Sequence, residues 1–300
     1  MKPLSIAIPT YRRPTDLVRC IQTIAPQLMQ GDEVLVLDDS DLAGDVQKKL
    51  KDLVRDAGAV FHYIHKPSQD IPRGSSYSRN YAAEKASHEY LCIFDDDIIL
   101  EKNFLDRVRM LWREHDSEKD LVALGGIITN NRKQGGLERC YNRIFGLSST
   151  RNWDVNRNGF QVWNDHIKNQ TKGYYLHGGL ASYRVAYLRH IGGFIQNVSG
   201  RAALEDVVFS LRAQHHGNYF LIDPAMCAHH DHSPHGRETT FQTGIKETRN
   251  RLILKDDLKR YQQYAPLSFY WALGGWILRQ FLVGSVRKGL GMIVGLWKKI

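Results

Sequence analysis

The segment that constrains the fold most is the apolar run at residues 90–94, which Asp95, Asp96 and Asp97 follow directly. A short apolar run bounded by polar residues is typical of a strand buried in a sheet. Such a strand would carry three carboxylates to one edge of the sheet, where they repel one another and lose hydration. A divalent cation offsets both effects, and oxygen ligands suit Mg²⁺ or Mn²⁺. A solvated acidic turn, or an aspartate cap on a following helix, is the alternative.

Strands and helices alternate along the first third of the chain. Apolar residues recur at helical spacing between short strand-like runs, and a helix is expected at 75–86. The expected strands are 4–8, 33–37, 60–64 and 90–94. This order predicts an α/β fold with a mostly parallel, Rossmann-like sheet flanked by helices.

Three polar clusters follow the expected strands, namely Thr10-Tyr11-Arg12, Asp38-Asp39 and the three aspartates at 95–97. The carboxyl ends of parallel strands meet at one edge of a sheet, and ligands bind there. We therefore expect the three clusters to converge on one site.

The second half has less regular patterning. Residues 130–175 are rich in Asn, Arg, Gly and aromatic residues, which predicts a loop-dominated insertion across the binding edge or an ordinary irregular surface. Further on, the pattern predicts strands at 180–183, 219–222 and 225–228, and helices at 185–191 and 203–215.

Composition excludes several classes of protein. The net charge of +9 is uneven, because residues 266–300 hold five basic residues and no acid. No zinc finger, RRM-type motif or Lys/Arg run indicates a nucleic-acid partner. No GxGxxG follows the first strand, which argues against a dinucleotide-dependent dehydrogenase. The four cysteines form no CxxC pair, and the sequence opens without a secretory signal, so reduced thiols and a cytoplasmic location are expected.

The C-terminal tail, residues 259–300, is expected to be helical. Residues 266–286 are almost all apolar, and beyond them apolar residues fall on one helical face, opposite Arg287, Lys288, Lys298 and Lys299. This pattern favours a helix lying in a membrane interface through 266–300. A helical pair packed on the rest of the protein and a true membrane span are the alternatives.

Seven segments together resemble the inverting family 2 glycosyltransferases, which have the GT-A fold. They occur in the family's order over roughly residues 4–255. The segments are IPTYRR at 8–13, VLVLDDS at 34–40, SRNYAAEKA at 78–86, YLCIFDDD at 90–97, HIGGF at 190–194, LEDVVFSLRAQHHG at 204–217 and RNRLIL at 249–254. The resemblance implies a GT-A domain at 1–258, with a nucleotide-sugar-binding half at 1–129 and an acceptor-binding and catalytic-base half at 130–258.

The resemblance also implies roles for individual residues. Asp97 would hold Mn²⁺ or Mg²⁺, Asp95 the ribose hydroxyls, and Asp96 would support them. Asp39 would accept a hydrogen bond from a uracil imide. The remaining residues expected at the nucleotide sugar are Pro9, Thr10, Tyr11, Arg12 and Arg79. For Asp39 a capped turn, and for Arg79 a surface position, are the alternatives.

Inverting transfer requires a carboxylate that takes the proton of the acceptor hydroxyl. By the family motif this base is Asp206, with Glu205 as the second choice. Acids in a first helical turn can also simply complement the helix dipole.

A histidine cluster follows at 229–235. By the resemblance His229, or else His230, would be a further metal ligand, while His232 and His235 belong to a polar loop. Zinc held by Cys227 and these histidines is a weaker alternative, because the spacing matches no closed site. The segment His177-Gly178-Gly179 would approach the donor sugar closely.

The resemblance, together with these features, implies a metal-dependent, inverting, hexosyltransferase-type enzyme. The expected donor is a UDP-sugar and the expected acceptor a saccharide or lipid-linked glycan, in surface polysaccharide biosynthesis at the inner face of the cell membrane. A metal-dependent phosphohydrolase and a noncatalytic membrane-associated binding module are the alternatives.

Overall fold

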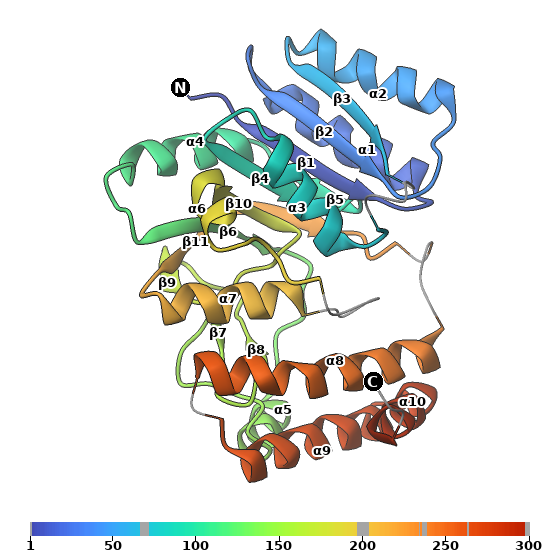
Figure 1. The fold of residues 1–300 in the computed structure, drawn as a ribbon, viewed down its shortest axis with the longest axis vertical. Coiled ribbons are helices and arrows are strands. Elements are labelled where there is room, and N and C mark those ends of the chain that lie inside the picture. Colours follow the sequence, from blue (N-terminus) through green and yellow to red (C-terminus); the bar gives the residue numbers. More distant parts are fainter. Residues whose placement is uncertain are drawn as a thin grey trace.

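The computed structural model describes residues 2–66, 72–196, 204–233, 235, 239–262 and 264–297. Ala203, the expected start of one helix, and Lys298 and Lys299 of the tail lie outside these ranges. Figure 1 shows an α/β fold with its N-terminal elements at one end and three C-terminal helices at the other.

The first half is a parallel sheet with helical connections, as the sequence predicts. The strands run in the order β3-β2-β1-β4, and each pair of neighbours is parallel. Their bounds are β1 (Ser5–Thr10), β2 (Glu33–Asp38), β3 (Val60–His65) and β4 (Tyr90–Phe94). The connections are α1 (Pro14–Ile24) with a 3₁₀ turn at Ala25–Gln27, α2 (Gly44–Asp56) and α3 (Ser75–Lys85).

The second half turns the sheet into a mixed one. Strand β10 (Leu180–Arg184) is antiparallel to both β4 and β6 (Leu121–Ile128). Strand β11 (Tyr219–His230) is parallel to β6 and antiparallel to β5 (Ile98–Leu100) and β9 (Thr171–Gly173). The strands expected at 219–222 and 225–228 are therefore one strand, whose register shifts between Ile222 and Cys227 around Pro224.

Two cores lie on the two faces of this sheet. Neighbouring strand residues alternate between them, as Ile6 and Ala7 do, because side chains of a strand point to opposite faces. Helices α1, α2 and α4 (Phe104–Glu114) cover one face through Leu17, Leu50 and Leu105. Helices α3, α6 (Val185–His190) and α7 (Glu205–His215) cover the other.

The segment 130–175 contains more regular structure than the expected loop. It holds helix α5 (Gly136–Ile144) and the short strands β7 (Asp154–Val155), β8 (Gln161–Val162) and β9. Trp153 and Phe160 are buried, so the segment has apolar anchors of its own rather than an irregular surface.

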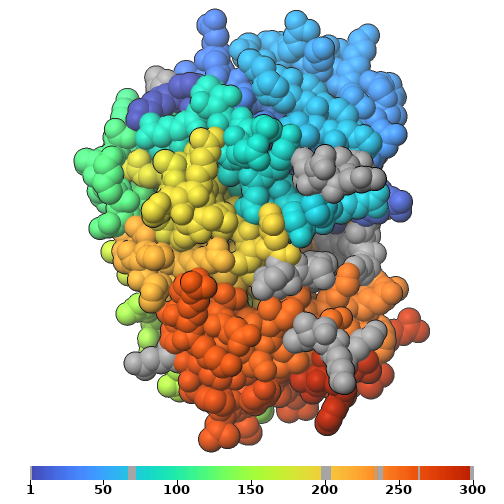
Figure 2. Space-filling view, in the orientation of Figure 1, coloured from blue at the N-terminus to red at the C-terminus, as the bar shows by residue number. Residues whose placement is uncertain are grey.

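The C-terminal helices α8 (Thr240–Tyr261), α9 (Pro266–Leu282) and α10 (Val286–Trp297) pack together at one end of the molecule (Figures 1 and 2). Glycines allow α10 to approach α8 closely: a Cβ on Gly291 would collide with the Phe241 carbonyl oxygen, and one on Gly295 would lie 2.7 Å from that of Ile245. The tail is thus a packed helical pair. None of the described helices is long and apolar enough to cross a membrane.

The packed tail still presents apolar side chains outward. The buried residues of α10 are Gly291, Met292 and Gly295, which lie next to α8, and Gly289, which lies next to Phe281 of α9. The apolar face predicted from the sequence remains exposed, with Leu290 at 47 % and Trp297 at 83 %. Packing on α8 and an outward apolar face therefore coexist.

Candidate active site

Hydrogen bonds join the three polar clusters at the carboxyl ends of β1, β2 and β4. The Asp39 backbone N–H donates to the Thr10 carbonyl at 3.0 Å. The Thr10 hydroxyl donates to Asp96 Oδ2 at 2.8 Å. The structure thus brings the three clusters together at one edge of the sheet. The Thr10 hydroxyl is used in the hydrogen bond to Asp96.

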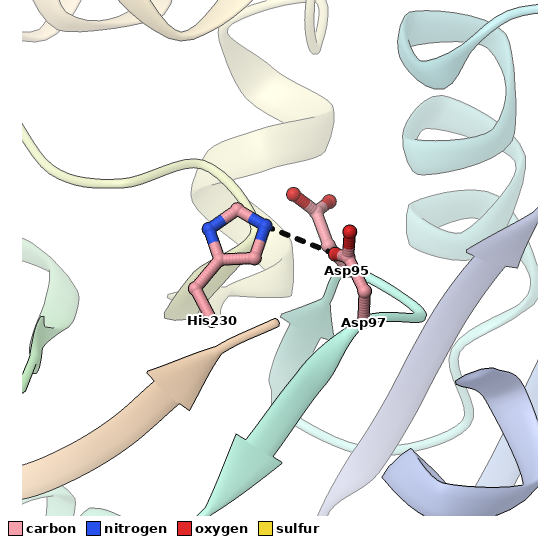
Figure 3. Close-up of side chains that lie close together, drawn as sticks. All are labelled: Asp95, Asp97 and His230. Atoms are coloured by element: carbon pink, nitrogen blue, oxygen red, sulfur yellow. Dashed lines mark ion pairs between the residues drawn. The ribbon is translucent and has the colours of Figure 1, made fainter. Parts of the chain in front are cut away.

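Asp95, Asp97 and His230 form a group able to hold a metal ion. Each offers one ligand atom, and these atoms lie within 4.8 Å of one another. Figure 3 shows the His230 ring, at the end of β11, facing the Asp97 carboxylate, with Asp95 beside them. His230 Nε2 lies 3.0 Å from Asp97 Oδ1. The two carboxylates are ligands that suit Mn²⁺ or Mg²⁺, and the imidazole adds one nitrogen ligand.

Of the two histidines expected as ligands, the structure favours the second choice. His229 lies outside this group; its side chain is 48 % exposed and its Nε2 is 3.4 Å from Asp231 Oδ1. Among the described residues the metal-binding group includes no cysteine, and the Cys227 thiol donates to the Pro224 carbonyl. The zinc alternative therefore gains no support.

Arg13, which was not predicted as a site residue, forms ion pairs with two of the three aspartates at 95–97. Its Nη1 lies 2.8 Å from Asp96 Oδ1 and 3.4 Å from Asp97 Oδ2. Burial raises the pKa of Asp96 to about 6, although Arg13 and Thr10 oppose the shift. Burial also acts on Asp97, but His230 and Arg13 outweigh it and hold the pKa of Asp97 at about 2. The two neighbouring carboxyls thus differ in environment: the pKa of Asp97 is lowered, and Asp96 is buried against Thr10 and Arg13.

Tyr11 lies in a surface depression beside this edge. The guanidinium groups of Arg12 and Arg73 lie 5.1 and 5.9 Å from the centre of its ring. The depression is also lined by Ser40 and Leu42. Pro9, the next-to-last residue of β1, is half-buried. An aromatic ring with flanking cations is suited to a planar base and its phosphates.

Asp39 is paired with a lysine that the sequence analysis missed. Lys66 is fully buried, and its Nζ lies 2.8 Å from Asp39 Oδ1 and 2.7 Å from the Ser78 hydroxyl. The Gly74 N–H donates to Asp39 Oδ2 at 3.0 Å. Lys66 directly follows β3, so its place at the carboxyl end of a strand was the available signal.

Arg79 is buried between two acids rather than exposed. Its Nη1 lies 3.0 Å from Glu205 Oε1, and its Nη2 lies 3.3 Å from Asp95 Oδ1. Burial opposes its charge, but these acids outweigh burial and raise the pKa of Arg79. The Ser75 hydroxyl also donates to Glu205, so Glu205 is committed to binding Arg79 and α3.

Asp206 lies on the wall of a cavity of about 470 Å³ that is also lined by Asp95, His177 and His230. The Tyr175 hydroxyl donates to Asp206 Oδ2 at 3.0 Å. Burial, followed by the charge of Glu205, raises the pKa of Asp206 to about 6. A carboxylate with this pKa can accept a proton near neutral pH. The preceding Leu204 has a left-handed backbone (φ 64°), which is uncommon for a branched residue.

The predicted segment His177-Gly178-Gly179 lies next to Asp95 and Asp206. A Cβ on Gly179 would overlap the Asp95 carboxylate, and one on Gly178 would lie 2.8 Å from Arg79 Nη1. His177 Nε2 is 3.1 Å from Asp165 Oδ1. The two glycines are needed so that Asp95 and Arg79 can reach their places.

The C-terminal helices complete the cavity. Arg251 of α8 and Trp276 and Arg279 of α9 line it. The Arg251 guanidinium lies 4.0 Å from the centre of the Phe160 ring and 4.7 Å from that of Trp276. Burial lowers the pKa of Arg251 to about 10. Of these three residues, only Arg251 lies in one of the family-like segments, and none of them was predicted to line the site. Tertiary packing alone brings them there.

Part of the chain is similar to a characterised enzyme. A Campylobacter jejuni protein described as GalNAc(5)-diNAcBac-PP-undecaprenol beta-1,3-glucosyltransferase is 27 % identical over 97 residues, which is 32 % of this chain. The match spans only 30 % of that protein.

Solved structures share the fold. The mannosyltransferase PcManGT from Pyrobaculum calidifontis, in complex with GDP-Man and Mn²⁺, superposes with a TM-score of 0.59 at 14 % identity, covering 98 % of this chain and 79 % of that one. S. aureus TarS 1-349 in complex with UDP-GlcNAc gives 0.56 at 16 % identity, covering 93 % and 73 %. The expected GT-A fold is thus confirmed. The sequence profile described as Glycosyl transferase family 2 matches residues 5–192, more than half of the chain, and the protein belongs to that family.

Proposed function

We propose that the protein is a metal-dependent inverting glycosyltransferase that moves a hexose from a UDP-sugar to a saccharide or lipid-linked glycan. One observation carries this proposal: the cavity wall holds both Asp206 and two members of the metal-binding group, Asp95 and His230. A proton acceptor and a site for a leaving diphosphate therefore face the same space.

The residues divide the reaction between them. Asp206 takes the proton of the acceptor hydroxyl as that oxygen attacks the anomeric carbon, and the nucleoside diphosphate leaves from the opposite face. One displacement of this kind inverts the anomeric configuration. Two hydrogen bonds hold the Asp206 carboxylate in place. The Tyr175 hydroxyl donates to Oδ2, and the Val207 N–H donates to Oδ1 at 2.8 Å.

The donor would bind along the carboxyl edge of the sheet. Asp39 would receive the uracil imide and Tyr11 would face the base, while Arg12 and Arg79 would face the phosphates. Asp95, Asp97 and His230 would hold Mn²⁺ or Mg²⁺, with Asp96 supporting them. A bound ion of this kind neutralises charge that develops on a leaving diphosphate.

We also propose that the enzyme acts at the inner face of the cell membrane, on a surface-polysaccharide precursor. The Campylobacter relative is described as acting on an undecaprenol-linked substrate. Exposed apolar side chains gather on α9 and α10, among them Leu267 at 89 %, Leu282 at 66 % and Trp297 at 83 %. Such a face, with basic residues nearby, suits an interfacial helix.

A panel of nucleotide sugars tests the proposal, with and without Mn²⁺. We expect one UDP-sugar to raise the unfolding temperature only with the metal, and its sugar to appear on an added glycan with inverted configuration by NMR. Hydrolysis of the donor's diphosphate to UMP and a sugar 1-phosphate, with no sugar on the glycan, would indicate a phosphohydrolase. Biological activity that survives Asp206→Ala would indicate a binding module.

Vesicle sedimentation tests the membrane part separately. The triple variant Leu267→Ser/Leu282→Ser/Trp297→Ser should lose binding to anionic vesicles and keep its unfolding temperature. Equal binding by the variant and the wild type would overturn the membrane proposal.

A further inference from the structure

A second groove adjoins the catalytic cavity. It encloses about 1240 Å³ between α5 and the segments 148–152 and 162–166. Asn142, Trp163 and Arg279 line both spaces. A ligand bound at Asp206 could therefore extend into this groove.

The wall of the groove is strongly cationic. It contains five basic residues and two acids, which are Arg132, Lys133, Arg139, Arg143, Arg279, Glu138 and Asp165. Glu138 is shared by Arg132 and Arg279, and Asp165 receives hydrogen bonds from Asn131 and the Ile128 N–H. Within the described part of the chain, Lys133, Arg139 and Arg143 form no ion pair.

Arg139 and Arg143 lie one turn apart on α5, so both side chains project from the same face of the helix. Both are exposed. Guanidinium groups bind phosphate oxygens through paired hydrogen bonds, which makes two of them at this spacing suited to a diphosphate.

Exposed apolar side chains also lie on α5 and α9. Leu137, 90 % exposed, and Ile144, 60 % exposed, lie on α5, on a different face of the helix from the two arginines. Helix α9 is joined to α5 by the Arg279–Glu138 ion pair and adds the exposed Leu278 and Leu282. A ligand with an anionic head and a hydrocarbon tail would match both surfaces.

We propose that Arg139 and Arg143, with Lys133, bind the diphosphate that links the acceptor saccharide to its lipid carrier. The carrier would lie along Leu137 and α9, and the saccharide would extend through the shared wall toward Asp206. This inference rests on the proposed function and adds to it a binding site for the acceptor's diphosphate, separate from the site of the donor.

Vesicle binding tests the site without knowledge of the sugar. Phosphatidylcholine vesicles carrying undecaprenyl diphosphate are compared with vesicles carrying phosphatidylglycerol at matched surface charge. The wild type should bind the diphosphate vesicles about tenfold more tightly, a difference of about 1.4 kcal/mol, because paired guanidinium contacts favour a diphosphate over a single phosphate of equal total charge. The variant Arg139→Gln/Arg143→Gln should lose that preference.

The variant Lys48→Gln/Lys49→Gln is the matched control, because it removes two exposed charges from α2. It should bind both kinds of vesicle as the wild type does. An unchanged preference in Arg139→Gln/Arg143→Gln, or no preference in the wild type, would overturn the diphosphate site. The proposed function would fail differently, through absent sugar transfer in the nucleotide-sugar assay.

Discussion

The Tyr175 hydroxyl donates a 3.0 Å hydrogen bond to Asp206 Oδ2, and this contact aims the carboxylate into the catalytic cavity. Tyr175 belongs to the segment before β10, whereas Asp206 is the second residue of α7. Glu205, by contrast, binds Ser75 and Arg79. Of the two adjacent acids, we therefore propose Asp206 as the one that accepts the proton.

Replacement Asp206→Asn should separate catalysis from stability. Loss of a general base lowers kcat by about 10²–10⁴-fold, while affinity for the donor should persist.

The pKa of Asp206 is raised from 3.8 to about 6, so the folded state binds more protons than the unfolded state between these values. Stability therefore falls as pH rises through this window, by at most about 3 kcal/mol. Urea denaturation at pH 8 should show Asp206→Asn as stable as the wild type or more so; a clear loss of stability would contradict this.

The dependence of kcat/KM on pH should reflect the ionisation of Asp206. Transfer needs ionised Asp206, so kcat/KM should rise with pH through an apparent pKa of about 6. The charged and titratable groups that act on Asp206 are Glu205, Arg79, Tyr175, Tyr183 and Arg251.

Removal of the Tyr175 hydroxyl should move that profile. A hydrogen bond to the carboxylate favours its ionised form, so Tyr175→Phe should raise the apparent pKa by about one unit. Tyr187→Phe is the control, since among the described residues the Tyr187 hydroxyl is buried without a hydrogen bond. A downward shift in Tyr175→Phe, or equal shifts in both variants, would argue against Asp206 as the base.

Lys66 should position Asp39 for the nucleotide. Lys66→Met leaves a buried carboxylate unpaired, which typically costs about 3–5 kcal/mol, and should weaken UDP binding as well. The double variant Lys66→Met/Asp39→Asn should recover stability but not UDP affinity. Urea denaturation and calorimetry measure the two effects, with the exposed Lys49→Met as control. Wild-type UDP affinity in the double variant would show that this pair has no part in base recognition.

Gly179→Ala should displace Asp95, because the added Cβ would overlap its carboxylate. A displacement of this size can lower kcat by about 100-fold. Gly44→Ala is the matched control, since its Cβ would meet no atom within 4 Å. Similar kcat values for both variants, each with a normal unfolding temperature, would contradict a fixed position for Asp95.

The first half of the fold was predictable because its signals are local. The runs at 4–8, 33–37, 60–64 and 90–94 have strand patterns and end in polar clusters, and the structure places these strands within two residues of expectation. Helix α4 was missed although Phe104, Leu105, Val108, Leu111 and Trp112 follow a helical spacing.

The rest of the site depends on contacts between distant segments. Tyr175 meets Asp206, and Arg279 of the tail reaches Glu138 of α5, through packing that no local pattern encodes. Which histidine lies next to Asp97 is set by the length of β11. This strand continues past a register shift near Pro224 and ends at His230.

Calorimetric titration with UDP, GDP and dTDP, with and without Mn²⁺, measures whether a metal held by Asp97 and His230 supports nucleotide binding. We expect one nucleotide, UDP, to bind the wild type about 100-fold more tightly with Mn²⁺, and Asp97→Asn and His230→Gln to lose this dependence while still folding. No heat with any nucleotide and Mn²⁺, or an undiminished Mn²⁺ effect in Asp97→Asn, would contradict this expectation.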